Sequence, residues 1–85
     1  MQDDVEQRVI EIIARRKRIE PAKLTMDSTF AELGIDSLDG MELLFTFEDS
    51  FNISIPESVA QRMKSVREVV EGLREVLVNR PAGAS

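Results

Sequence analysis

Apolar residues recur at helical spacing in three stretches of this 85-residue chain. In the first stretch they fall within one arc of about 100° on a helical wheel, which predicts an amphipathic helix over about residues 3–16. The apolar series consists of Val5, Val9, Ile12 and Ile13. A basic run at residues 15–18 follows at the end of this helix, where cations suit the negative pole of the dipole. We interpret the run as a helix-capping and solubility feature.

The second stretch predicts a helix over about residues 37–51 that has two apolar faces. One arc is wide enough to face a core and comprises Gly40, Leu43, Leu44, Phe47 and Phe51. The other side carries an apolar ridge bordered by carboxylates: Leu38, Met41 and Phe45 lie among Asp39, Glu42, Glu48 and Asp49. Packing does not explain an apolar ridge that faces away from the core. We therefore predict that it is a docking strip for a partner.

The rest of the chain predicts a short helix and a third amphipathic one. Pro56 suits the first turn of a short helix over about residues 57–63. Ser65 and Glu68 form a capping-box pattern before a helix over about residues 65–78. Residues 17–36 show no sustained period and predict a long first loop, with a helical turn at 29–33 that Gly34 ends.

These elements predict an all-α fold, because no stretch alternates apolar and polar residues as a half-buried strand does. A chain of this length has room for one small domain, which we place at residues 1–80. Residues 81–85 contain too little apolar surface to pack, and we expect a flexible tail there.

Charge is distributed unevenly along the chain. The net charge is −5, and eight acidic residues but no basic one lie between Lys23 and Arg62. This acidic middle would repel nucleic acid and favours partners with basic patches, although a solvated surface would explain it equally well. No apolar run approaches the length of a membrane segment, so we expect a soluble, cytoplasmic protein.

Ser37 stands at the start of the second predicted helix, directly after the glycine turn. Unpaired backbone N–H groups and the positive dipole end would stabilise a phosphate group there. The chain has no His and no Cys, so Ser37 lacks the usual base of a nucleophile and we predict no enzyme activity and no metal site. The plainer alternative is that Asp36 or Ser37 only caps the helix.

The arrangement as a whole resembles the acyl carrier proteins. The residues that carry the resemblance are Phe30-Ala31-Glu32-Leu33-Gly34-Ile35-Asp36-Ser37-Leu38-Asp39, Glu42-Leu43, Glu48-Asp49-Ser50-Phe51 and Ile53-Ser54-Ile55-Pro56-Glu57. The resemblance implies an antiparallel four-helix bundle whose Ser37 carries 4'-phosphopantetheine, with Asp36 and Leu38 in the same cofactor-binding site. A separate Mg-dependent phosphopantetheinyl transferase would donate this arm from coenzyme A.

The resemblance also implies a role and a set of partners. Acyl groups would travel as thioesters between enzymes of fatty-acid, polyketide or related specialised lipid synthesis. The monomeric carrier would dock on basic patches of the transferase and of acyl-transfer and chain-elongation enzymes. The docking residues would be Leu38, Asp39, Met41, Glu42, Phe45, Glu48, Asp49 and Glu57. We expect an acyl pocket lined by Gly40, Leu44, Phe47, Phe51, Ala60 and Met63.

Gly40 departs from the family pattern, in which a larger residue is usual at this place. Because Gly40 lies on the inward arc, we hypothesise that it leaves room at the mouth of the acyl pocket, although a tolerated weak point in the helix would explain it equally well. Two other functions remain open from the sequence. One is a small acidic helical module that binds a partner without a prosthetic group, and the other is an aminoacyl or peptidyl carrier.

Overall fold

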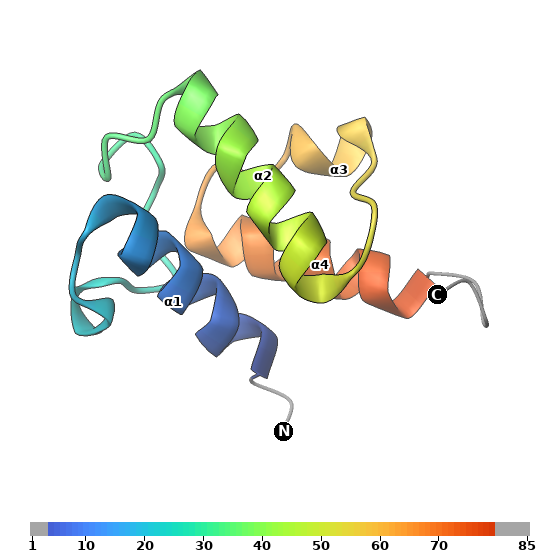
Figure 1. Ribbon diagram of the computed structural model, residues 1–85, viewed down its shortest axis with the longest axis horizontal. Helices are drawn as coiled ribbons and strands as arrows, with labels where there is room; N and C mark the ends of the chain where they lie inside the picture. The colour runs from blue at the N-terminus through green and yellow to red at the C-terminus, as the bar shows by residue number, and fades with distance from the viewer. Residues whose placement is uncertain (1–3, 80–85) are drawn as a thin grey trace.

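The computed structural model describes residues 4–79, which form four α-helices and one short 3₁₀ helix (Figure 1). In chain order these are α1 (Asp4–Lys17), η1 (Pro21–Lys23), α2 (Ser37–Phe51), α3 (Glu57–Ala60) and α4 (Val66–Asn79). The predicted all-α fold with three main helices and one short helix is confirmed. The tail predicted at 81–85 lies outside the described residues. Within residues 4–79, no helix combines the length and the apolar composition needed to cross a membrane.

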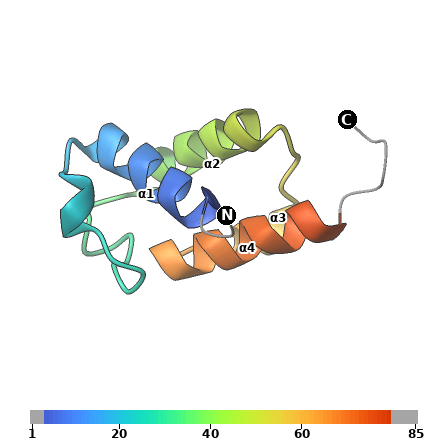
Figure 2. The same cartoon turned by 90° about the horizontal axis from the view of Figure 1, so that it is seen from below.

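The helices pack around one core. α1 runs in the opposite direction to α2 and α4 (Figure 1), and it packs against both of them. Figure 2 shows α1 and α2 on one side of the molecule and α4 on the other, with α3 packed on α4. All three main helices supply fully buried side chains: Val9, Ile13, Leu43, Phe47, Val66, Val69, Val70 and Leu73. The inward arc that the sequence predicts for α2 therefore does face the core.

The short helix α3 ends at Ala60, three residues before the predicted end at 63. The Gln61 N–H still bonds to the Glu57 carbonyl four residues back, but the next two N–H groups bond to carbonyls three residues back. That of Arg62 lies 3.0 Å from the Val59 oxygen, and that of Met63 lies 3.1 Å from the Ala60 oxygen. This tighter winding replaces the α-helical pattern, and the Met63 side chain is buried.

The first loop is fixed against the start of α4. The Phe30 N–H donates to the Lys64 carbonyl at 3.0 Å, and the Val66 N–H donates to the Ser28 carbonyl at 2.9 Å. The loop also contains η1, which the sequence analysis did not predict although proline is a known signal at a first helical position. Two apolar residues of the loop are buried in the core: Leu24 and Ile35. The loop thus delivers the chain to α2 in a defined place.

Gly72 allows α3 and the segment after it to approach α4 closely. A Cβ atom at this position would lie 2.8 Å from the Met63 methyl carbon and 3.0 Å from a Val59 methyl carbon. Distances this short are sterically unfavourable, so the absence of a side chain at Gly72 allows Met63 and Val59 to pack directly against α4. Gly72 is buried, in line with this role.

Candidate functional site

Two linked turns lead into α2. Thr29 and Glu32 form a reciprocal capping box: the Glu32 N–H donates to Thr29 Oγ1 at 3.1 Å, and the Thr29 N–H donates to Glu32 Oε1 at 3.2 Å. This box opens the helical turn that the sequence predicts at 29–33. The box itself was not predicted, although its Thr-x-x-Glu pattern is a sequence signal for it. Gly34 then ends the turn with φ 72°, a left-handed conformation that glycine adopts without steric cost.

Asp36 is the residue that caps α2. Its Oδ1 accepts a hydrogen bond from the Asp39 N–H at 2.8 Å, which stabilises the first turn of the helix by about 1 kcal/mol. Ser37 is therefore the first helical residue and not the cap, and it is exposed. Among residues 4–79, the Ser37 hydroxyl has no hydrogen-bond partner, and neither do the N–H groups of Ser37 and Leu38. The start of α2 thus offers a free hydroxyl beside free donors.

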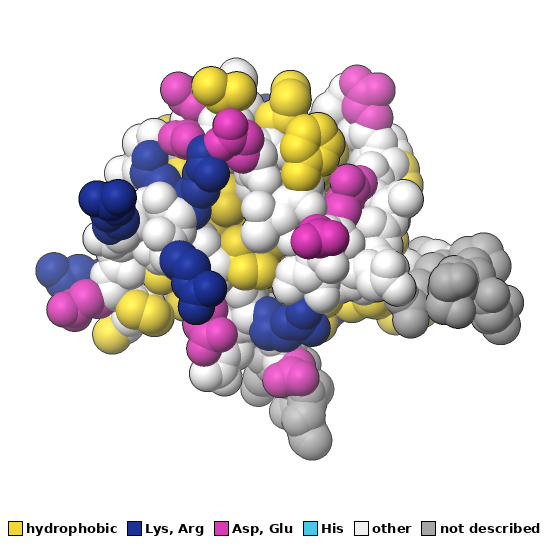
Figure 3. All heavy atoms as spheres, in the orientation of Figure 1, with side chains coloured by type: hydrophobic (Ala, Val, Ile, Leu, Met, Phe, Trp, Pro, Cys, Tyr) yellow, Lys and Arg dark blue, Asp and Glu magenta, His cyan; other side chains and the backbone are white. Residues whose placement is uncertain are grey.

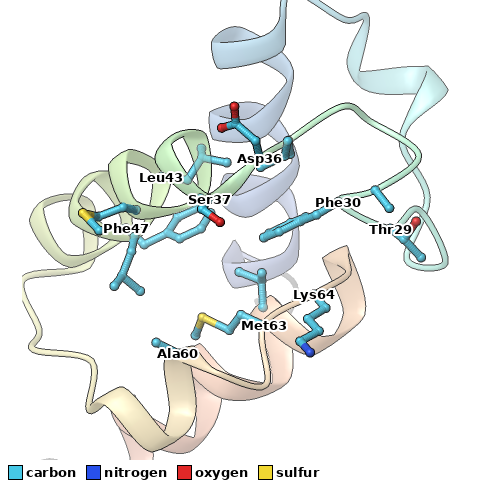
Figure 4. A pocket seen from close by; sticks show the side chains of 15 residues that line it. Thr29, Phe30, Asp36, Ser37, Leu43, Phe47, Ala60, Met63 and Lys64 are labelled. Carbon is cyan, nitrogen blue, oxygen red and sulfur yellow. The ribbon is translucent and has the colours of Figure 1, made fainter.

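An apolar cleft of about 780 Å³ opens beside Ser37. It lies between α2 and the Ala60–Lys64 segment, with Thr29 and Phe30 at one end (Figure 4). The Ser37 side chain faces this cleft, whereas the Asp36 carboxylate points away from it (Figure 4). The volume lies within the usual range for sites that bury a small molecule.

Five of the six residues predicted for an acyl pocket line this cleft: Gly40, Leu44, Phe47, Ala60 and Met63. Gly40 faces open space, because a Cβ atom there would meet nothing within 4 Å. Phe51 does not line the cleft; it is buried near the other end of α2. The cleft also includes lining residues that the sequence analysis missed, since they come from the loop and α4 or from the outer face of α2: Phe30, Ile35, Met41 and Val69.

The apolar ridge of α2 lies on the surface. Leu38 is 64% exposed, Met41 is 54% exposed and Phe45 is 58% exposed. These are three of the four large hydrophobic residues that are exposed within residues 4–79. Figure 3 shows hydrophobic side chains gathered over α2 with acidic side chains around them. The helical wheel therefore placed this ridge correctly, and its role as a docking strip remains a prediction.

The carboxylates around the ridge differ in their surroundings. Arg16 forms ion pairs with Asp39, at 3.3 Å, and with Glu42, and Lys17 Nζ lies 3.1 Å from Asp39 Oδ2. The hydrogen bond from Lys17 is the main cause that lowers the pKa of Asp39, with a further contribution from the charges of Lys17 and Arg16. Burial of Asp39 opposes this effect. The basic run at the end of α1 thus does more than cap its own helix.

Of the other carboxylates at the predicted docking surface, one binds a backbone N–H group and two have no partner among the described residues. Glu48 Oε2 accepts a hydrogen bond from the Ile55 N–H at 2.8 Å. Within the described part of the chain, Asp49 and Glu57 have neither an ion pair nor a side-chain hydrogen bond, and both are exposed. Residues 4–79 contain no group of three acidic side chains arranged to hold a metal ion.

Arg8 joins α1 to the C-terminal end of α2, a contact that the sequence analysis missed. Its guanidinium donates to the Ser50 carbonyl and, at 2.7 Å, to Ser50 Oγ. The guanidinium carbon also lies 4.1 Å from the centroid of the Phe51 ring. Sequence offered no signal for this pairing, because the partners are more than forty residues apart.

The sequence is similar to a known protein family and to individual proteins along most of its length. A family model described as "Phosphopantetheine attachment site" matches residues 7–73. An acyl carrier protein of Amoebophilus asiaticus is 40% identical over 78 residues, which cover 91% of this chain and 98% of that protein. Another from Akkermansia muciniphila is 39% identical over 75 residues, covering 87% of this chain and 94% of that protein.

A solved structure shares the fold. The structure titled "Mupirocin didomain ACP" matches with a TM-score of 0.80 at 20% sequence identity. The match covers 100% of this chain and 46% of the solved chain. At this level of identity the likeness concerns the arrangement of the helices alone.

Proposed function

The chain belongs to the acyl carrier proteins, a family of phosphopantetheine-binding carriers that are not enzymes, and we propose that Ser37 is its attachment point. The observation that carries this proposal is the free hydroxyl of Ser37 at the first position of α2. It is exposed and has no hydrogen-bond partner among residues 4–79, so a modifying enzyme can reach it without breaking a contact.

The start of α2 suits the phosphodiester of the arm. The N–H groups of Ser37 and Leu38 have no partners in the described structure, and the positive end of the helix dipole lies there. Asp36 uses one carboxylate oxygen to cap the helix and points away from the cleft (Figure 4). Its negative charge is therefore directed away from the cleft that Ser37 faces.

The chain provides an apolar cleft for an acyl group but no thiol that could bind it covalently. When bound, phosphopantetheine provides a terminal thiol that can hold an acyl group as a thioester, which this cysteine-free sequence cannot do itself. Phe30, Phe47 and Met63 line the adjacent cleft and favour an apolar chain over a polar one. We propose that acyl groups of fatty-acid, polyketide or related specialised lipid synthesis fold into this cleft during transport.

The outer face of α2 is the proposed docking surface. Its exposed ridge of Leu38, Met41 and Phe45 supplies apolar contact area, and the surrounding carboxylates favour enzymes with basic patches. The proposed partners are a phosphopantetheinyl transferase and enzymes of acyl transfer and chain elongation. We propose that the protein meets them as a monomer in the cytoplasm. Contacts steered by exposed charges allow the rapid exchange that a shuttle needs.

The test is enzymatic modification followed by intact mass measurement. The protein is incubated with coenzyme A, Mg²⁺ and a broad-specificity phosphopantetheinyl transferase. We expect the wild type to gain the mass of one arm and Ser37→Ala to gain none. Ser58→Ala is a matched control, because Ser58 is also an exposed helical serine, and it should be modified like the wild type. A wild type without the mass gain, or a modified Ser37→Ala variant, would overturn the proposal.

A further inference from the structure

The basic end of α1 already occupies part of the proposed docking surface. Arg16 pairs with Asp39 and Glu42, which border the apolar ridge. Lys17 binds Asp39 as well, and its Nζ also lies 3.3 Å from the Gly34 carbonyl. In the free protein, the two carboxylates nearest to Ser37 on this face are therefore neutralised by cations of the same chain.

The two cations are held to different extents. The Lys17 and Asp39 side chains are 23% and 25% exposed, and Lys17 has the Gly34 carbonyl as a second partner. Arg16 and Glu42 are more exposed, at 37% and 44%. Exposed ion pairs are weak, because water competes for both charges and the long side chains lose conformational freedom. The Arg16–Glu42 pair is therefore the one that can open at little cost, while Lys17 stays in place.

Such an opening would change what a partner meets. Asp49 and Glu57 are available to an external cation at any time, since no described residue pairs with them. Glu42 becomes available only when Arg16 leaves it. A partner with a basic patch thus has to displace the Arg16 guanidinium from Glu42 with one of its own cationic side chains. This exchange takes place at the end of the docking surface that is closer to Ser37.

We propose that Arg16 competes, within the same chain, with the cationic side chains of a partner enzyme for Glu42 and Asp39. This inference rests on the proposed docking function of α2. The partner fits by its chemistry: a patch of Arg or Lys side chains around an apolar contact. After a partner has displaced it, the Arg16 guanidinium remains tethered beside Glu42 and Asp39 and can bind them again. Arg16 therefore weakens the partner's ion pairs near Ser37 and shortens the lifetime of each complex.

The test compares two variants that lose the same charge. Arg16→Gln removes the competitor, whereas Arg15→Gln removes a neighbouring exposed arginine that forms no ion pair within residues 4–79. Both variants change the net charge equally, so long-range steering is matched. The dissociation constant of each apo variant is measured with a phosphopantetheinyl transferase and Mg²⁺, without coenzyme A, so that no turnover occurs.

We expect Arg16→Gln to bind about two- to five-fold more tightly than Arg15→Gln, the range that corresponds to one exposed ion pair. The difference should shrink at high ionic strength, because salt screens exposed charges. In a Glu42→Gln background, Arg16→Gln should lose most of its advantage. Equal affinities of the two single variants, or weaker binding by Arg16→Gln, would overturn the competition.

The outcome is separable from that of the proposed function. Mass gain on the wild type reports attachment, and the ratio of the two dissociation constants reports competition. A wild type that is modified while the two variants bind equally would overturn the competition alone. A wild type that binds but is never modified would overturn the attachment alone, and a wild type without any binding would contradict the docking surface itself.

Discussion

Lys17 Nζ lies 3.1 Å from Asp39 Oδ2 and thereby ties the last residue of α1 to the first turn of α2. The same lysine reaches the carbonyl of Gly34, the residue that ends the turn before Ser37. The helix that carries Ser37 is thus held at its start by a side chain from another helix. This contact makes the stability of the fold depend on pH.

Lys17→Gln should raise the pKa of Asp39. In the wild type the hydrogen bond from Lys17 holds this pKa below its ordinary value of 3.8. A carboxyl with a lowered pKa in the folded state stabilises the fold above the pKa of the unfolded chain, and this stabilisation is lost as the pH falls through the folded-state value. The gap in unfolding free energy between wild type and variant should therefore be constant near neutral pH and narrow below about pH 4.

The measurement is an NMR titration of the Asp39 side-chain carboxyl in both proteins. Lys23→Gln serves as the control, because Lys23 is an exposed lysine without an ion pair among the described residues. It should leave the Asp39 titration where the wild type has it. An unchanged midpoint in Lys17→Gln would show that the contact does not persist in solution.

Arg8→Ala should destabilise the fold by about 1–2 kcal/mol. It removes two hydrogen bonds to Ser50 and the stacking of a guanidinium on Phe51, at the helix end where a cation is favourable. Arg15→Ala is the matched control, because it deletes an exposed arginine of the same helix and should change the stability by less than about 0.5 kcal/mol. Urea denaturation of both variants checks this prediction, and equal losses would argue against the Arg8 contact.

The same substitution should act differently at two helical glycines. Gly40→Ala should stabilise the protein by up to about 1 kcal/mol, since alanine favours helix and a Cβ atom there meets nothing within 4 Å. Gly72→Ala gains the same propensity but forces Met63 and Val59 to move, which costs roughly 1–3 kcal/mol when a core is overpacked. Urea unfolding should therefore rank Gly40→Ala above wild type and above Gly72→Ala. The reverse order would contradict the packing at Gly72.

Gly40→Val should weaken the protection of a bound acyl chain. Gly40 lines the cleft beside Ser37, and a larger side chain would occupy space at its mouth. Loss of contact with one methylene group, about 0.8 kcal/mol, corresponds to roughly four-fold faster hydrolysis of a long-chain thioester. Gly40→Ala should have a smaller effect, and Gly40→Val with an unchanged hydrolysis rate would count against an acyl chain in this cleft.

Periodicity predicted the parts of the molecule that depend on one helix at a time. The wheel of α2 alone separates buried Leu43 and Phe47 from exposed Leu38, Met41 and Phe45. Likewise, Ser65 Oγ accepts from the Glu68 N–H at 3.2 Å as its capping pattern predicts, although the Glu68 carboxylate accepts from Lys64 and not from Ser65. Local signals suffice here because the interacting residues are three or four positions apart.

Contacts between helices could not be predicted in the same way. The partners Arg16 and Asp39 are 23 positions apart, and their pairing depends on how α1 crosses α2. Phe51 was expected in the acyl pocket because it shares an arc with Phe47, but the axis of α2 carries it past the end of the cleft. A wheel describes direction around a helix and contains no information on which neighbour stands opposite each turn.

The most direct test of attachment at Ser37 is to locate the phosphopantetheine arm within the chain. Because no basic residue lies between Lys23 and Arg62, trypsin should release one peptide of residues 24–62 that contains Ser37 and four other serines. Fragmentation of this peptide from the transferase-treated protein, by mass spectrometry, assigns the modified residue. Attachment at Ser37 predicts a single phosphopantetheine on that residue. An arm on any other residue, or a peptide that remains unmodified after treatment, would contradict it.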